Sequence, residues 1–238
     1  MIDLHCHLAY GVDDGAQTQS DSIALALALE QAGVTHVACT SHFRRDRAWM
    51  NNASVQKQIH SKLDALLGDK GPIRIKGAEH YLDELLLESC RSKQAVPYEL
   101  NGKQSSWILL ELPYQTPPPK LMDVLFRIQT TGYKILLAHL ERFPYVYAYP
   151  EKVEALRNAG CLIQVNLGSL AGAYGKEYQL AAEKLLKGGQ VDVLAGDCHH
   201  ADDVGRFIVE GLKAAKGLIG GADLRRLTVD NPSEIVGL

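Results

Sequence analysis

Met1-Ile2-Asp3-Leu4-His5-Cys6-His7-Leu8 opens the chain, and its length and apolar content are typical of a buried β-strand. A helical pattern follows, which Ser20 can cap and which runs to Ala32 before Gly33 stops it. Strand and helix together make one βα unit, and the same alternation of short apolar runs and longer helical patterns continues along the chain. The opening stretch therefore predicts an α/β protein with a parallel sheet whose strands are covered on both faces.

Seven βα units can be counted in this pattern. The predicted strands are Met1–Leu8, His36–His42, Ile73–Tyr81, Trp107–Pro113, Tyr133–Leu140, Cys161–Leu167 and Val191–Asp197. Beyond the first helix, the predicted helices are Val55–Leu67, Asp83–Ser92, Lys120–Thr131, Pro150–Gly160, Glu177–Lys187 and Val204–Leu218. No repeat or Pro/Gly-rich linker divides the chain. Residues 1–238 are therefore predicted to form a single-domain, closed or nearly closed barrel, although an open doubly wound sheet has the same local pattern.

Composition and charge argue against several classes of protein. The 238 residues carry a net charge of -3 with no block of Lys or Arg, so no nucleic-acid partner is expected. The five cysteines do not resemble a disulfide framework, which indicates a reducing compartment. No apolar run reaches the length of a membrane span, and the N-terminus lacks a signal-peptide pattern. The chain is predicted to be cytoplasmic, without membrane insertion.

Histidine and acidic side chains recur at the C-terminal ends of the predicted strands. They are His5 and His7, His42, Glu79, Glu111, His139, and Asp197 with His199. In βα barrels the active site is built at that rim, so residues far apart in the sequence are expected to converge there. His5 and His7 stand two apart on one strand, which places both imidazoles on the same face, and Asp197 and His199 repeat this spacing.

These residue types indicate a metal centre. Neutral imidazoles and carboxylates suit divalent zinc, manganese or iron, and the number of residues exceeds what one tetrahedral ion can use. Neighbouring ions can hold a bridging hydroxide and clamp a phosphate between them, which neutralises charge during in-line attack. The pattern therefore predicts a cluster of ions that acts on a phosphoester.

Motifs around these residues resemble those of a known family. They are Asp3-Leu4-His5-Cys6-His7 with Asp13-Asp14-Gly15, Thr40-Ser41-His42, Gly77-Ala78-Glu79, Ile108-Leu109-Leu110-Glu111-Leu112-Pro113, His139-Leu140-Glu141-Arg142 and Gly196-Asp197-Cys198-His199. Their order and spacing are similar to those of the polymerase-and-histidinol-phosphatase (PHP) superfamily, and in particular of its bacterial capsular and exopolysaccharide tyrosine-protein phosphatases. The resemblance covers nearly the whole chain, down to Asn231-Pro232.

The resemblance implies a distorted (β/α)7 TIM-like barrel with two or three divalent metal ions, manganese being favoured over iron or zinc. The implied ligands are His5, His7, Glu79 and Asp197 for the first ion, Glu79, Glu111 and His139 for the second, and Asp14, His42 and His199 for the third. Arg142 and Arg206 match arginines that bind the phosphate. The implied activity is phosphotyrosine hydrolysis by a metal-bridging hydroxide. The implied substrate is the C-terminal tail of a bacterial tyrosine kinase that controls capsule or exopolysaccharide synthesis.

The sequence departs from the family pattern without losing an implied ligand. Ser41-His42-Phe43 stands where the family commonly has Pro-His-His, and Leu140 replaces a proline. Cys198 and His200 stand in place of a small residue and an asparagine. The side chain of His200 is expected to point away from that of His199, so His200 is left out of the predicted ligands.

Three alternative functions are weighed against this one. Cys39 and Arg45 have the spacing of the phosphate loop in cysteine-dependent tyrosine phosphatases, but no glycine lies between them to turn the backbone amides inward. The same ligands serve histidinol-phosphate phosphatases and other small-molecule phosphoesterases, although Glu111 stands where other branches often have histidine. A non-catalytic protein that binds metal and a phosphorylated tail is the third alternative.

Overall fold

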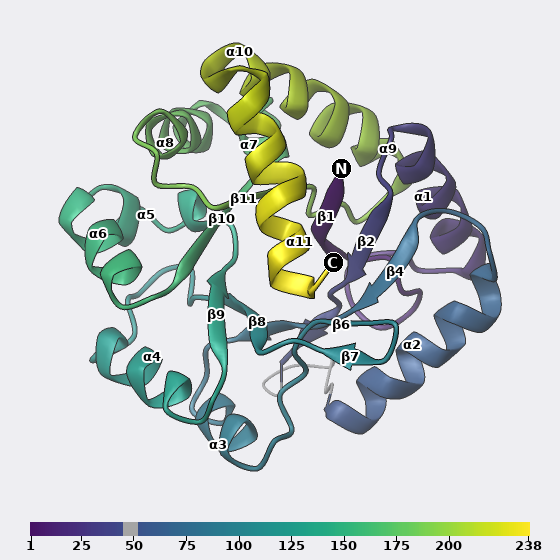
Figure 1. The fold of residues 1–238 in the computed structure, drawn as a ribbon, viewed down its shortest axis with the longest axis horizontal. Helices are drawn as coiled ribbons and strands as arrows, with labels where there is room; N and C mark the ends of the chain where they lie inside the picture. The colour runs from purple at the N-terminus through teal and green to yellow at the C-terminus, as the bar shows by residue number, and fades with distance from the viewer. Residues whose placement is uncertain (45–51) are drawn as a thin grey trace.

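Parallel strands from the whole length of the chain form the wall of a barrel (Figure 1). The structure is a computed structural model that describes residues 1–44 and 52–238. The strands of the wall are β1 (Ile2–Cys6), β2 (His36–Cys39), β3 (His42–Phe43), β4 (Ile73–Lys76), β5 (Glu79–Tyr81), β8 (Trp107–Glu111), β9 (Lys134–Leu137), β10 (Leu162–Asn166) and β11 (Val193–Ala195). Strands β6 (Glu99–Leu100) and β7 (Lys103–Gln104) form an antiparallel hairpin at one edge, which the sequence pattern did not predict.

Hydrogen bonds close the wall into a ring. One sheet runs β1-β2-β4-β6-β7 and the other β11-β10-β9-β8-β5-β3. The predicted strand His36–His42 is divided into β2 and β3, and Ile73–Tyr81 is divided into β4 and β5, so each half belongs to a different sheet. The ends meet where the Asp197 N–H donates to the His5 carbonyl at 2.8 Å and the His7 N–H donates to the Cys198 carbonyl at 3.0 Å. The barrel predicted from the sequence is therefore confirmed, and the open doubly wound sheet is not.

Helices surround the barrel (Figure 1). They are α1 (Gln19–Gln31), α2 (Ala53–Leu67), α3 (Leu86–Arg91), α4 (Leu121–Gln129), α5 (Pro144–Tyr147), α6 (Pro150–Asn158), α7 (Leu167–Leu170), α8 (Lys176–Lys187), α9 (Ala201–Val204), α10 (Glu210–Arg225) and α11 (Asn231–Val236). A 3₁₀ turn, η1 (Leu140–Arg142), and two π turns, η2 (Gly205–Val209) and η3 (Arg226–Asp230), lie between them. None of the helices within the described ranges is long and apolar enough to span a membrane.

The first helix begins earlier than predicted. Thr18, not Ser20, caps α1: its side chain accepts a hydrogen bond from the Asp21 N–H, and the Asp21 carboxylate accepts one from the Thr18 N–H. This reciprocal pair satisfies two N–H groups that the first turn of a helix otherwise leaves without partners. Ser20 cannot form such a pair because the residue three positions on is Ile23, and the helix accordingly starts at Gln19.

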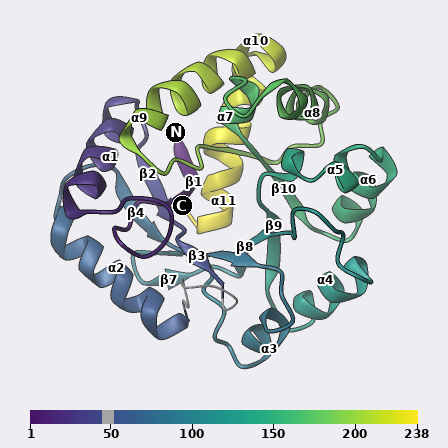
Figure 2. The ribbon, with the colours of Figure 1, turned by 180° about the vertical axis from the view of Figure 1, so that it is seen from behind.

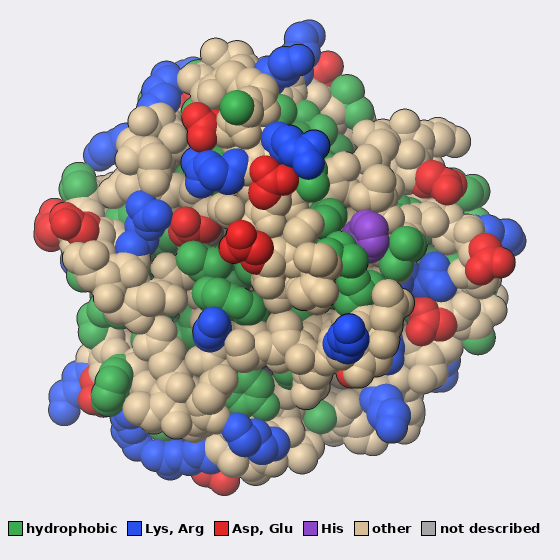
Figure 3. All heavy atoms as spheres, in the orientation of Figure 1, with side chains coloured by type: hydrophobic (Ala, Val, Ile, Leu, Met, Phe, Trp, Pro, Cys, Tyr) green, Lys and Arg blue, Asp and Glu red, His purple; other side chains and the backbone are tan. Residues whose placement is uncertain are grey.

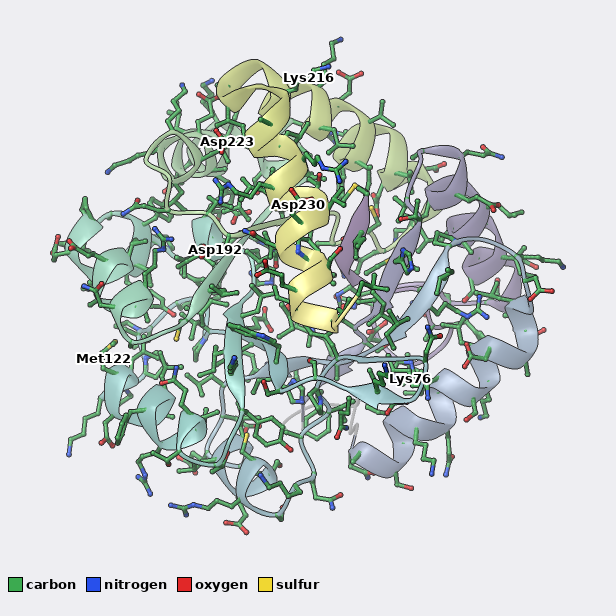
Figure 4. All side chains as sticks on the ribbon, viewed as in Figure 1. Lys76, Met122, Asp192, Lys216, Asp223 and Asp230 are labelled. Carbon is green, nitrogen blue, oxygen red and sulfur yellow. The ribbon has the colours of Figure 1, made fainter. Side chains whose placement is uncertain are left out.

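The C-terminal helix covers the end of the barrel at which the strands begin. Ile235 of α11 packs in one buried cluster with Leu4, Ile75 and Leu136 from three strands of the wall. The Asn231 side chain donates to the carbonyl of Asp192, at the entrance to β11, at 2.8 Å, and Figure 4 shows Asp192 beside this helix. On this face acidic and basic side chains are interspersed (Figure 3). The opposite end, seen from behind in Figure 2, carries the loops that follow the strands.

Candidate metal centre

Histidines and carboxylates from separate strands meet at the C-terminal end of the barrel. His5 Nε2 lies 3.3 Å from Glu79 Oε2 and 3.2 Å from Asp197 Oδ1. His7 Nε2 lies 3.4 Å from each of the same two oxygens. His139 Nε2 lies 2.9 Å from the other oxygen of Glu79. Imidazoles from β1 and from the ends of β1 and β9 thus surround the fully buried carboxylate of Glu79, and Asp197 from the end of β11 joins them through His5 and His7.

A second group of residues lies nearer to solvent. Asp14 Oδ1 lies 3.4 Å from His42 Nε2 and 3.4 Å from His199 Nε2. The His199 ring stacks on that of His7 with 4.0 Å between centroids, so the outer group adjoins the inner one. The Asp14 carboxylate is half-exposed. Burial opposes ionisation of Asp14, but His199 and His42 outweigh it and hold its pKa below the usual range.

Glu111 joins the cluster from the end of β8. Its carboxylate forms a potential ligand group with His42 and Glu79, whereas His139 groups with His5 and Glu79. Arg44 Nη1 lies 3.8 Å from Glu111 Oε2. The pKa of Glu111 is raised to about 7, chiefly by burial and further by the negative charge of Glu79. All of the predicted ligands are therefore brought together, while the assignment of each to one ion stays a prediction.

The donor set fits divalent cations. Four overlapping groups of histidines and carboxylates each have ligand atoms within 4.8 Å of one another. Glu79 Oε2 is buried, and within the described part of the chain it has imidazole nitrogens of His5, His7 and His42 at 3.0–3.4 Å but no hydrogen bond of standard geometry. A buried charged oxygen needs a positive charge beside it, because isolation of a carboxylate from water is costly, and a divalent ion or protonated imidazoles can supply that charge.

The charge balance of the inner group leads to the same conclusion. Burial lowers the pKa of His5, but the carboxylates of Asp197 and Glu79 outweigh burial and raise it to about 9. The pKa of His42 is raised to about 10 in the same way, against its burial, chiefly by Glu79. Without ions, the cluster thus holds protons on imidazole nitrogens that could coordinate a metal. Metal ions compete with protons for such nitrogens, so binding is expected to release protons.

Two of the converging residues have backbone conformations that are unusual for residues other than glycine. His139 and Asp197 have φ angles of 32° and 52° at the ends of β9 and β11. A left-handed conformation of this kind costs roughly 1–3 kcal/mol and persists only where the surroundings hold it. Both positions turn the chain abruptly out of the strand, which places the two side chains at the mouth of the barrel.

Asp13 has a role in the site that the sequence did not reveal. Its Oδ2 accepts hydrogen bonds from His7 Nδ1 at 2.9 Å and from the His42 N–H at 3.0 Å, and its Oδ1 accepts from the Gly15 N–H at 3.0 Å. The carboxylate thereby orients His7 with Nε2 toward the cluster, a common arrangement behind metal-binding histidines. Gly15 is required here because a Cβ at this position would collide with the carbonyl oxygen and Cβ of His7.

The two predicted phosphate-binding arginines, Arg142 and Arg206, differ in their contacts and in their exposure to solvent. Arg142 is the last residue of the 3₁₀ turn η1 after β9. Its Nη1 lies 3.9 Å from Asp197 Oδ2, and its guanidinium lies 5.3 Å from the centre of the Tyr174 ring. The turn is anchored by buried Glu141, which accepts a hydrogen bond from Ser169 Oγ at 2.6 Å. Arg206 is exposed, and its Nη2 donates to the Ala173 carbonyl at 3.0 Å. Arg142 is therefore the arginine held against the cluster.

The cysteine-based alternative conflicts with the structure. Burial raises the pKa of the Cys39 thiol to about 12, so the nucleophilic thiolate is not available at neutral pH. Its expected partner, Arg45, lies outside the described residues. The five cysteines are all buried and none is in a disulfide. His200 is exposed and belongs to none of the ligand groups found in the described part of the chain.

Comparisons with known proteins agree with this geometry. A family model described as "Capsular polysaccharide synthesis, CpsB/CapC" matches residues 1–237. Tyrosine-protein phosphatase CpsB of Streptococcus agalactiae is 26% identical over 248 residues, covering 99% of this chain and 98% of that protein. Tyrosine-protein phosphatase YwqE of Bacillus subtilis is 26% identical over 200 residues, covering 84% of this chain and 78% of that protein.

Solved structures extend the comparison to the fold. A structure from work on YwqE of B. subtilis and CpsB of Streptococcus pneumoniae, described as unique metal-dependent tyrosine phosphatases, matches with a TM-score of 0.88 and 25% identity, covering 99% of this chain and 94% of that one. Histidinol phosphate phosphatase of Lactococcus lactis has a TM-score of 0.57 at 13% identity, covering 91% and 92% of the two chains, which supports a shared fold alone. On the strength of the family match over almost its entire length, this chain belongs to the CpsB/CapC capsular polysaccharide synthesis family.

Proposed function

We propose that this protein removes phosphate from phosphotyrosine in a protein substrate, with Arg142 and a cluster of divalent ions at the barrel mouth as its catalytic groups. It is a metal-dependent tyrosine-protein phosphatase of the CpsB/CapC family, which functions in capsule synthesis. The observation that carries the proposal is the convergence of imidazoles and carboxylates on the buried Glu79 carboxylate. Such a cluster has no structural purpose that apolar packing would not serve better.

The residues that would hold the ions fall into the overlapping groups described above. They are His5, His7, Asp14, His42, Glu79, Glu111, His139, Asp197 and His199. When bound, divalent ions supply Lewis acidity toward phosphate oxygens and lower the pKa of water. We propose manganese as the favoured ion, as the resemblance of the motifs implies, and these nitrogen and oxygen ligands accept manganese, iron and zinc alike.

The chain itself binds and orients the phosphate. Arg142 presents a planar guanidinium beside Asp197, and this group can pair with two phosphate oxygens at once. Arg206, whose side chain donates to the Ala173 carbonyl, supplies a second, more exposed cation. The phenol that leaves has an ordinary pKa of about 10, so its departure requires less protonation than that of an alkyl alcohol.

The substrate that we propose is the tyrosine-rich C-terminal tail of a bacterial tyrosine kinase that controls capsule or exopolysaccharide synthesis. Membership of a capsular polysaccharide synthesis family and the similarity to tyrosine-protein phosphatases support a phosphotyrosine protein as the substrate. An extended tail can bring its phosphotyrosine to the rim without the kinase domain contacting the barrel. Histidinol phosphate is the alternative substrate, supported by a likeness in fold alone.

Hydrolysis assays test this proposal. Purified protein is assayed with a phosphotyrosine peptide and with histidinol phosphate, before and after removal of metal by a chelator. We expect chelator-sensitive turnover of the peptide, restored by added manganese, and much slower turnover of histidinol phosphate. The variants His5→Ala, Glu79→Ala and Arg142→Ala are expected to lose activity. A protein that binds metal but turns over no phosphoester would instead indicate the non-catalytic alternative.

A further inference from the structure

Strand β10 contributes none of the nine ligands, yet two of its side chains contact residues that do. Gln164 and Asn166 are both fully buried and stand two apart, so both face the interior of the barrel. We propose that these two amides form a hydrogen-bond relay, which runs from His5 through Gln164 and Asn166 to Asp197. This relay fixes His5 in the tautomer with Nε2 free for metal and restricts Asp197 to one metal-facing oxygen. This inference rests on the metal centre of the proposed function.

The direction of the relay is fixed by a backbone group. The His139 N–H donates to Gln164 Oε1 at 3.0 Å, and a backbone N–H can only donate. The atom of Gln164 at that position must therefore be its oxygen, although amide oxygen and nitrogen are otherwise easily interchanged. The same oxygen lies 3.1 Å from His5 Nδ1. Since Oε1 can only accept, Nδ1 of His5 carries the proton.

The consequence for His5 follows from imidazole chemistry. In a neutral imidazole one nitrogen holds the proton and the other holds the lone pair that binds a metal. His5 Nε2 faces Glu79 Oε2 at 3.3 Å and Asp197 Oδ1 at 3.2 Å. When an ion displaces the proton that Nε2 holds in the ion-free cluster, the remaining proton is on Nδ1 and the lone pair of Nε2 is available to the ion. Gln164 therefore selects the nitrogen that can coordinate.

The relay continues through the second amide to Asp197. Because Gln164 Oε1 is an acceptor, its Nε2 is the donor to Asn166 Oδ1 at 2.6 Å. Asn166 Nδ2 in turn donates to Asp197 Oδ2 at 2.7 Å. One oxygen of Asp197 is thus engaged, while Oδ1 faces His5 and His7. A single strand without ligands holds residues from β1 and from the ends of β9 and β11 in one arrangement.

These are positioning residues, and removal of the relay is expected to weaken metal binding. Mutation of partners behind metal ligands typically lowers affinity roughly 10-fold to 100-fold. Gln164→Met keeps the volume but removes both the acceptor and the donor. Gln164→Glu keeps an oxygen for the two N–H groups, but it replaces the donor toward Asn166 by an acceptor and adds a negative charge. The matched control is Gln129→Met, because the Gln129 side chain also hydrogen-bonds to the backbone, donating to the Ala159 carbonyl at 2.8 Å, and it lies away from the cluster.

The first measurement is the zinc dissociation constant, obtained by competition with a chromogenic chelator. We expect Gln164→Met to bind zinc roughly 10-fold to 100-fold more weakly than the wild type. We expect Gln164→Glu to recover part of that loss and Gln129→Met to match the wild type. Wild-type affinity in Gln164→Met would overturn the inference. If the wild type itself binds neither zinc nor manganese, the proposed function fails instead, so the two failures are distinguishable.

The second measurement requires no variant and so does not depend on whether Gln164→Met folds. In the zinc-loaded wild-type protein, ¹H–¹⁵N correlation spectra of the histidine rings report which nitrogen of His5 is protonated. We expect the proton on Nδ1, and in Gln164→Glu we expect it to stay there. A proton on Nε2 of His5 in the wild type would contradict the relay. A purely structural role for Gln164 makes no prediction about this proton.

Discussion

Replacement of Asp13 by asparagine is expected to lower the stability of the protein and its affinity for metal, although none of the predicted ligands is replaced. Asp13 is buried and accepts three hydrogen bonds, from His7 Nδ1, the His42 N–H and the Gly15 N–H. Burial opposes ionisation of this carboxyl, but His7 outweighs it and holds the pKa of Asp13 below its usual value. Asparagine has the same shape but offers one oxygen and one NH₂ group.

The size of the effect follows from these three bonds. Whichever way the introduced amide is turned, its NH₂ group must face at least one buried N–H donor, and a buried donor without a partner costs about 1–3 kcal/mol. The remaining hydrogen bonds are made to a neutral amide in place of a carboxylate, and charge-assisted hydrogen bonds are roughly twice as strong as neutral ones. Together these changes are expected to lower the free energy of unfolding by about 2–4 kcal/mol.

Urea unfolding of the chelator-treated protein measures this loss, and zinc competition measures the accompanying fall in affinity, which is expected to be roughly 10-fold or more. The matched control is Asp64→Asn, which makes the same chemical change at a half-exposed ion pair with Arg74 and is expected to cost about 0–1 kcal/mol. An Asp13→Asn variant as stable as Asp64→Asn, with unchanged zinc affinity, would refute the assignment of Asp13 as the group that orients His7.

Three further predictions concern the backbone, the phosphate and the protons of the site. Gly15→Ala is expected to displace His7, because its Cβ would collide with the His7 backbone, and thus to lower zinc affinity and stability by about 1–3 kcal/mol in the same assays. Arg142→Lys is expected to lower kcat/KM for a phosphotyrosine peptide roughly 10-fold or more at unchanged metal content, and an unchanged kcat/KM would argue against a paired contact with phosphate. The pKa values of His5 and His42 are raised to about 9 and about 10, above the ordinary histidine value, so their contribution to the stability of the ion-free protein is present below pH 6.5 and is lost as the pH rises through 9 to 10. Bound ions replace these protons, so the difference in Tm between the zinc-loaded and the zinc-free protein should be larger at pH 8 than at pH 6. A difference in Tm that shrinks with rising pH would contradict this charge balance.

The convergence of these ionisable residues could be predicted because such a side chain rarely ends an apolar strand unless it binds something. His5, Glu79 and Asp197 are ionisable residues within otherwise mostly apolar buried segments, and the barrel brings such positions together at one rim. The residues that orient the ligands could not be predicted in the same way. Gln164 and Asn166 are neutral amides, which occur throughout proteins, and only their hydrogen bonds across the barrel reveal a role.

Local backbone conformation could not be predicted from the sequence either. The left-handed conformations of His139 and Asp197 are rare for these residue types, and the surrounding fold imposes them. The sequence favours Ser20 as the cap of the first helix, because a serine before an apolar pattern is a strong signal. Thr18 takes that position because it forms a reciprocal pair with Asp21, which depends on the path of the preceding loop.

Anomalous X-ray diffraction from crystals of the manganese-loaded protein, recorded on both sides of the manganese absorption edge, tests the central claim most directly. The account predicts two or three peaks at the C-terminal mouth of the barrel. Each peak should lie at bonding distance, about 2.0–2.3 Å, from nitrogen or oxygen atoms of the cluster, with one peak beside His5 Nε2 and Asp197 Oδ1. Crystals of active enzyme with no peak there, or with metal bound only elsewhere on the molecule, would contradict the account.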